Sequence, residues 1–209
     1  MNQPSNSAPK HEVARRLYDD DSPPYEQLPR KFVARLEPAT AREGRNEARF
    51  FVNDELVGDV LRDNAYDEDG YRFHDTIHVA LAAGLGWSPV LRSLLRRKRR
   101  SSALVDEVED GGRAIALDEA VCLLIHDYAT THGFVLDRGT IDEEFVGLLR
   151  RLTRHLEVAD RSSQDWWKAV CMASESYSSI TDWGGGLLSV DLDKGTLEAH
   201  ALNSELTPA

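Results

Sequence analysis

The sequence has only two cysteines among its 209 residues, Cys122 and Cys171, and both lie in apolar helical patterns. Cysteines in such surroundings usually behave as small core hydrophobes, so no disulfide framework is predicted. No apolar run approaches the roughly 20 residues that a membrane span needs, and the first ten residues lack the pattern of a secretory signal. We therefore expect a cytoplasmic protein that does not enter a membrane.

A surplus of basic residues is also missing. The formal net charge of -11 argues against a general nucleic-acid-binding surface, because a protein that binds the phosphate backbone needs a basic face to displace counterions. The charge is nevertheless uneven, since the one strongly basic stretch, within residues 92–100, runs directly into an acidic stretch at 106–110. Adjacent blocks of opposite sign suit a metal-bound anion.

Apolar periodicity predicts a mainly α fold, a bundle of about five helices in a single domain. Residues 1–25 are predicted to be a disordered lead, and residues 26–209 a single helical domain. Within it we expect a small β-hairpin at about 31–53, a helical core at about 71–182, and a second short hairpin near the C-terminus. The predicted helices are 71–86, 90–97, 112–131, one that Thr140 and Glu143 open with a capping box, and one that opens at Ser162 or Ser163.

Two histidines and a carboxylate gather at the start of the first predicted helix. Helix geometry places His74 and His78 one turn apart on nearly the same face, with Asp75 as a neighbour. Such a group can bind a metal or transfer protons, although one histidine could instead hydrogen-bond locally while the other packs in the core. The positive end of the helix dipole favours a bound anion there, so Asn64, in the preceding acidic turn, is a candidate substrate-binding residue.

A second candidate site is the acidic cluster that contains Asp106, Glu109 and Asp110. These oxygen ligands suit Mg²⁺, but a solvated acidic loop is the simpler interpretation, and Arg113 could neutralise Glu109 through an i,i+4 pair. Glu119 has apolar helical neighbours, so its carboxylate is expected to be partly buried and to need a partner. We predict Glu109, Glu119 and His78 as catalytic residues and the following metal ligands: His74, Asp75, His78, Asp106, Glu109, Asp110 and Glu119.

The basic run has two interpretations as well. It could be a solvated helix end, or it could capture phosphate, since arginine offers bidentate hydrogen bonds and lysine a point charge. We predict Lys98, Arg99 and Arg113, together with Asn64, as phosphate- or substrate-binding residues.

A longer stretch resembles a known family. Residues of about 58 to 129, which include GDVLRDNAYDEDGYRFHDTIHVALAAGLGWSPVLRSLLRRKRRSSALVDEVEDGGRAIALDEA, look like the domain at the C-terminal side of some bacterial MazG-type nucleotide pyrophosphohydrolases. The resemblance implies an all-α nucleotide pyrophosphatase that splits nucleoside triphosphates into monophosphate and pyrophosphate. It also implies Mg²⁺ held by acidic residues on helices and a nucleotide substrate. A homo-oligomer, a dimer, is expected as well, because an acidic surface on a helical bundle would fit dimerisation.

The sequence departs from that family at its catalytic motifs. MazG-type helices carry E-E-x-x-E followed by E-x-x-D, whereas this chain has His74-Asp75-x-x-His78, and then Asp106-x-x-Glu109 or Glu109-Asp110. Either histidines have rebuilt the metal site, which would favour Mn²⁺ or Zn²⁺ over the Mg²⁺ expected first, or the domain has lost the reaction.

Three alternatives stay open. An HD-type phosphohydrolase would use His126-Asp127, with His74 or His78 and a later aspartate such as Asp160. A zinc peptidase is disfavoured, because an aspartate replaces the glutamate base and no third ligand is evident. A non-catalytic nucleotide-sensing or partner-binding module, in a stress or phage-response system, is the third.

Overall fold

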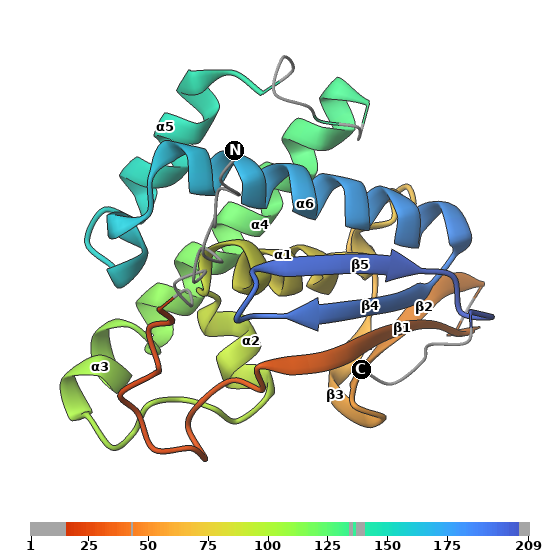
Figure 1. The fold of residues 1–209 in the computed structure, drawn as a ribbon. Helices are drawn as coiled ribbons and strands as arrows, with labels where there is room; N and C mark the ends of the chain where they lie inside the picture. The colour runs from red at the N-terminus through yellow and green to blue at the C-terminus, as the bar shows by residue number, and fades with distance from the viewer. Residues whose placement is uncertain (1–15, 43, 134–135, 137–140, 205–209) are drawn as a thin grey trace, which may run out of the picture.

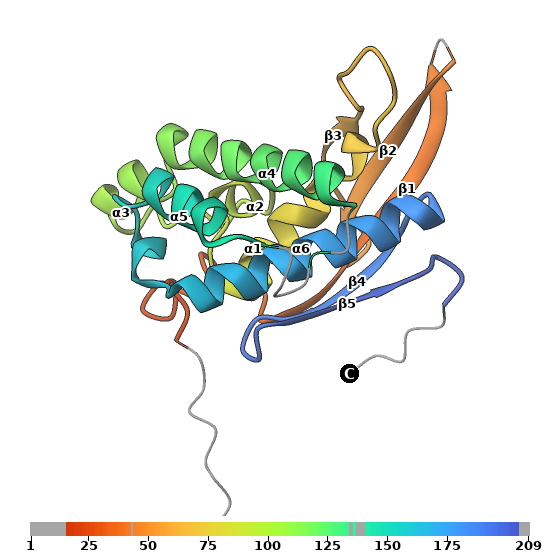
Figure 2. The ribbon, with the colours of Figure 1, turned by 90° about the horizontal axis from the view of Figure 1, so that it is seen from above.

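The computed structural model describes residues 16–42, 44–133, 136 and 141–204 of the chain. A five-stranded antiparallel sheet in the order β3-β2-β1-β4-β5 forms one layer, and the helices cover one of its faces (Figures 1 and 2). The strands are β1 (Lys31–Arg42), β2 (Arg45–Val52), β3 (Glu55–Leu61), β4 (Gly186–Asp191) and β5 (Thr196–His200). The helices are α1 (Asp75–Leu85), α2 (Pro89–Leu94), α3 (Ala103–Val108), α4 (Gly112–His132), α5 (Glu143–Leu152) and α6 (Ser163–Trp183), with 3-10 turns η1 (Tyr71–Phe73) and η2 (Glu157–Asp160).

The predicted mainly α bundle is therefore wrong, and so is the all-α fold that the family resemblance implied. The two expected hairpins do form, but they belong to one sheet, because β1 pairs with β4 from Lys31–Asp191 to Leu36–Gly186. Strand β3 was not predicted at all. The pairing of segments about 160 positions apart does not affect the local periodicity of the sequence. The sequence therefore could not show that the two hairpins belong to one sheet.

The helices follow the sequence pattern more closely. Helix α1 ends at Gly86, which has the left-handed φ of 70° that glycine tolerates best. Ser88 caps α2 by accepting a hydrogen bond from the Leu91 amide, and a capping box opens α6. Thr140 lies outside the described residues, and Asp142 caps α5 instead. Helix α3, which carries part of the acidic cluster, was not predicted.

Helix α1 occupies the centre of the helical layer, since ten of its eleven residues are buried. It packs along α6 (Figure 2), and the contact is close at Gly84. A β-carbon at that position would lie 2.6 Å from Cβ and 2.9 Å from Cα of Ala169. Because so little space separates the two backbones, α6 fixes the position of α1, which carries two of the candidate ligands.

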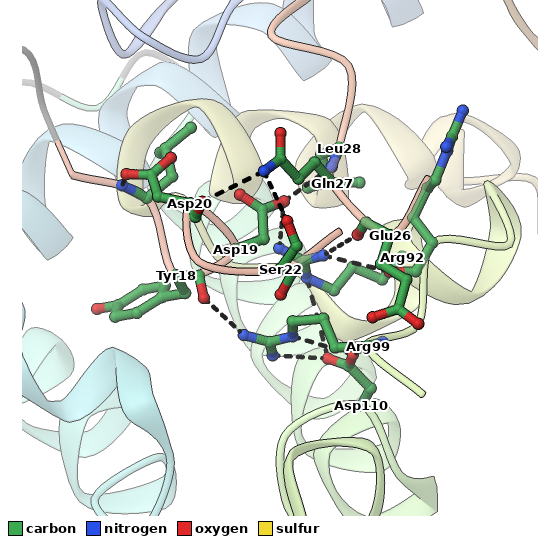
Figure 3. A network of polar contacts seen from close by, with 12 residues as sticks. Tyr18, Asp19, Asp20, Ser22, Glu26, Gln27, Leu28, Arg92, Arg99 and Asp110 are labelled. Atoms are coloured by element: carbon green, nitrogen blue, oxygen red, sulfur yellow. Dashed lines mark hydrogen bonds and ion pairs between the residues drawn. The ribbon is translucent and has the colours of Figure 1, made fainter. Parts of the chain in front are cut away.

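The N-terminal segment, residues 16–30, packs against the end of α2, and part of it falls in the 1–25 lead expected from the sequence. Leu17 and Leu28 are buried. The Asp19 carboxylate accepts hydrogen bonds from the Leu28 amide at 2.7 Å and from Arg92 Nη2 at 2.8 Å (Figure 3). Arg30 Nη1 donates to the other Asp19 oxygen at 2.7 Å. A buried ion-pair network thus ties this segment to the helical layer.

Candidate metal centre

Helices α1 and α4 bring two histidines and a glutamate to one point. His74 precedes α1, His78 lies one turn later, and Glu119 lies on α4. One ligand atom from each of these side chains lies within 4.8 Å of the others. Two imidazoles and a carboxylate form a ligand set that recurs at divalent metal sites with open positions.

Both imidazoles are fixed by hydrogen bonds at Nδ1. His74 Nδ1 lies 2.8 Å from the Tyr71 carbonyl oxygen, and its ring stacks on the Tyr71 ring at a centroid distance of 4.4 Å. His78 Nδ1 lies 2.9 Å from Asp118 Oδ1. Since a carbonyl or carboxylate oxygen can only accept here, each ring donates from Nδ1, and the lone pair of the neutral ring, the form that binds a metal, lies on Nε2.

The two Nε2 atoms face carboxylates. His78 Nε2 is buried without a hydrogen-bond partner in the described part of the chain, and Glu119 Oε2 lies 3.5 Å from it. His74 Nε2 lies 3.6 Å from Asp75 Oδ1. A buried nitrogen left unpaired is costly, and a metal ion at this point would satisfy it, so the residues present fit a bound cation.

Asp118 is the residue that sequence reasoning missed. It is fully buried, and its second oxygen accepts hydrogen bonds from Ser88 Oγ at 2.7 Å and the Val90 amide at 3.0 Å. One carboxylate therefore links α1, α2 and α4. The sequence did contain an indication of its role. Asp118 lies on the same buried stripe of α4 as Ala114 and Val121, and a carboxylate at a buried position needs a polar partner.

The electrostatics of the cluster favour a cation. Burial raises the pKa of Asp75, and the structure shows no hydrogen bond to its carboxylate among the described residues. Burial opposes a charge on His78, but the Asp118 carboxylate outweighs it and raises the pKa of His78 well above its ordinary value. The approach of His78 Nε2, 3.5 Å from Glu119 Oε2, lowers the pKa of Glu119. The carboxylates of Asp118 and Glu119 thus favour a positive charge at His78, and a bound metal ion could take the place of the proton there.

The other predicted site residues lie outside this cluster. Asp110 is buried against Arg99, whose Nη2 lies 2.7 Å from its Oδ1 (Figure 3), and Arg99 also pairs with Glu157 at 2.8 Å. Glu109 accepts a hydrogen bond from the Glu157 amide at 2.9 Å. Between the acidic cluster and the basic run, therefore, Arg99 and Asp110 neutralise each other. The remaining predicted residues, Asp106 on α3, Lys98 before it, Arg113 in the first turn of α4 and Asn64 in an exposed loop, also lie outside the cluster.

The residues of the HD alternative do not assemble in the described structure. His126 Nε2 lies 3.0 Å from the Tyr177 hydroxyl, whereas Asp127 is exposed on another side of α4. Asp160 accepts a hydrogen bond from the Tyr18 hydroxyl. None of these three residues belongs to the metal-binding group.

Fold and site together define a two-layer α/β protein whose helical layer can hold a divalent cation between two histidines and a glutamate. The chain belongs to the MazG C-terminal domain family, because the family model matches residues 13–203, and it is thereby related to MazG-type nucleotide pyrophosphohydrolases. The match extends well beyond the 58–129 region of the sequence resemblance. The chain matched no curated protein and no solved structure. Within the described residues, no helix has the length and apolar character to cross a membrane.

Proposed function

We propose that the chain is a metal-dependent hydrolase that splits nucleoside triphosphates or related phosphorylated nucleotides into monophosphate and pyrophosphate. One observation carries this proposal. His74 and His78 both donate from Nδ1 to fixed acceptors, so their Nε2 atoms are directed toward a point that Glu119 also reaches. Family membership supplies the substrate class.

The ligand set favours a transition metal. His74, His78 and Glu119 would hold the ion, and two imidazoles suit Mn²⁺ or Zn²⁺ better than Mg²⁺, which prefers oxygen ligands. Such an ion, when bound, lowers the pKa of a water molecule and polarises a phosphoryl oxygen.

The surrounding residues orient the ligands and accept protons. Asp118 holds the His78 ring, and the Tyr71 carbonyl with its stacked ring holds His74. Asp75 is the remaining carboxylate beside the cluster and would accept the proton of the attacking water. The Glu119 side chain is 46% exposed whereas His78 is 1% exposed, so substrate would approach from the Glu119 side.

Pyrophosphate release from a panel of nucleoside triphosphates tests the proposal. Protein stripped with EDTA should regain turnover with Mn²⁺ or Zn²⁺ more than with Mg²⁺. Glu119→Gln should lower kcat/KM by about 100-fold or more, because a metal ligand supplies several kcal/mol of transition-state stabilisation. Glu107→Gln, which alters an exposed carboxylate of α3, is the matched control and should retain activity.

Two outcomes would contradict the proposal. Folded protein that turns over no nucleotide with any of the three metals is not this hydrolase. A loss of activity in Asp127→Asn that equals the loss in Glu119→Gln would favour the HD alternative, because Asp127 is exposed and lies outside the cluster.

A further inference from the structure

The loop between α2 and α3, residues 95–102, carries several cationic side chains, some of which are exposed while another is buried. Arg99 points inward to Asp110 and Glu157, and buried Arg92 donates to the Arg97 carbonyl oxygen at 3.3 Å. Arg96 and Arg100 are exposed. The two buried arginines therefore hold the backbone of the loop in place. The exposed cations of the loop extend from a backbone whose position is fixed.

The outward cations surround a hollow of about 770 Å³ between this loop and the N-terminal segment. Arg96, Lys98 and Arg100 line it with the hydroxyl-bearing side chains of Ser93 and Ser101. One carboxylate, that of Glu26, is also present, but its two oxygens accept hydrogen bonds from the Ser101 amide at 2.9 Å and the Ser101 hydroxyl at 2.6 Å.

These three cations pair with no carboxylate in the part of the chain that the structure describes, although the sequence carries a net charge of -11. Three like charges around one hollow repel each other, and a multiply charged anion would relieve that repulsion. Arginine forks, a lysine ammonium and the Ser93 hydroxyl are donors of the kind that bind phosphate groups, whereas the Ser101 hydroxyl already donates to Glu26. Tyr25, 67% exposed at the same hollow, offers a ring on which a base could stack.

We propose that this hollow binds the phosphate groups of a small polyphosphate ligand, inorganic triphosphate or the triphosphate of a nucleotide, at a site separate from the metal centre. No lining residue belongs to the metal-binding group. Ser88 and Val90 lie at the start of α2, beside Asp118, whereas Arg96 follows the end of the helix. At a rise of about 1.5 Å per residue, the six-residue helix separates the two sites by about 9 Å or more.

Calorimetric titration of EDTA-treated, metal-free protein tests the proposal with three ligands: inorganic triphosphate, ATP and a single-stranded oligonucleotide. Triphosphate should bind, and added NaCl should weaken it. The triple variant Arg96→Gln, Lys98→Gln, Arg100→Gln should lose about tenfold or more in affinity, since charge-assisted hydrogen bonds are removed. A triple variant of exposed arginines elsewhere, Arg49→Gln, Arg151→Gln, Arg154→Gln, removes the same charge and should bind as the wild type does.

The remaining measurements separate the sources of the phosphate groups and the two proposals. Tighter binding of ATP than of triphosphate, with a difference that Tyr25→Ala removes, would assign a nucleotide; equal binding would assign the phosphates alone. Glu119→Gln should leave triphosphate binding unchanged, so a failure of the hydrolase proposal does not affect this one.

The hollow is not a polyphosphate site if triphosphate fails to bind, if both triple variants bind equally, or if only the oligonucleotide binds. Thermal unfolding of the hollow variant should match wild type, and Lys98→Gln alone gives a second variant with a smaller loss.

Discussion

At the scale of single residues, the arrangement of the candidate metal centre depends on Asp118. Its two oxygens serve different partners, since Oδ1 accepts from His78 and Oδ2 accepts from Ser88 and the Val90 amide. The same side chain thus orients a ligand and joins two helices. Substitutions can separate these tasks, because Ser88 contacts only the second oxygen.

Asp118→Asn should lower metal affinity by about 10- to 100-fold, the usual effect of losing a carboxylate that orients a histidine ligand. Ser88→Ala is the control, since it removes one hydrogen bond to Asp118 and the α2 cap. It should cost about 1 kcal/mol of stability with little change in metal affinity. Calorimetric titration with Mn²⁺ and Zn²⁺, together with thermal unfolding, measures both quantities. Equal metal affinities in the two variants would show that Asp118 is structural only.

At the scale of elements, the N-terminal segment is held by charges as well as by apolar contacts. Asp19 and Arg92 are both nearly inaccessible to solvent. Burial alone would raise the pKa of Asp19, but Arg92 and the hydrogen bonds outweigh it, so the pKa of Asp19 is lowered. A buried pair of this kind adds little when intact, yet the loss of one partner leaves the other charge uncompensated.

The sign of the pH dependence follows. Because the folded state lowers the pKa of Asp19, its ionised form stabilises the fold above the ordinary aspartate value of about 3.9, and this contribution is lost as the pH falls through the lowered value. Asp19→Asn should cost about 3–5 kcal/mol at pH 7. Urea unfolding should show a smaller difference from wild type near pH 3. Asp21→Asn, at a position 87% exposed in an ion pair, should change little at either pH; a difference that does not shrink in acid would contradict the assignment.

At the scale of the whole molecule, the C-terminal hairpin completes the core. β4 lies between β1 and β5 in the sheet, and its Leu188 and Val190 are buried. A chain that ends at residue 184 would expose one side of β1 and the helical face that these residues cover. It should show no cooperative thermal unfolding by circular dichroism. Glu198→Gln, at an exposed position of β5, is the control and should unfold as the wild type does.

Local patterns predict much of the helical layer but not the sheet. Caps and periodicity are local properties, so the starts of α2 and α6 and the end of α1 could be predicted closely from Ser88, Ser162 and Gly86. The antiparallel pairing of β1 with β4 depends on which surface α1 and α6 leave to be covered, a property of the assembled chain.

In the candidate site, too, local spacing predicts one part and the packing of the helices determines the rest. Helical spacing alone places His74 and His78 on one face, and their rings lie 5.8 Å apart in the structure. The meeting of Glu119 with this pair depends on how α1 and α4 pack. The sequence could not show that Arg99 folds back onto Asp110, because a run of cations beside a run of acids also fits a bound metal and substrate.

The order of strands also has a consequence for synthesis. β1 begins at Lys31, but its partner β4 ends at Asp191, so roughly 8 to 30 s separate their emergence at about 5–20 residues per second. Helix α6, which packs against β4 and β5, is made only shortly before β4. Until then β1, whose Phe32 and Leu36 are buried in the folded protein, has only one of its two neighbouring strands. Nascent chains of this protein should therefore depend on chaperones that shield apolar β-hairpins, and slowing translation should lengthen that dependence.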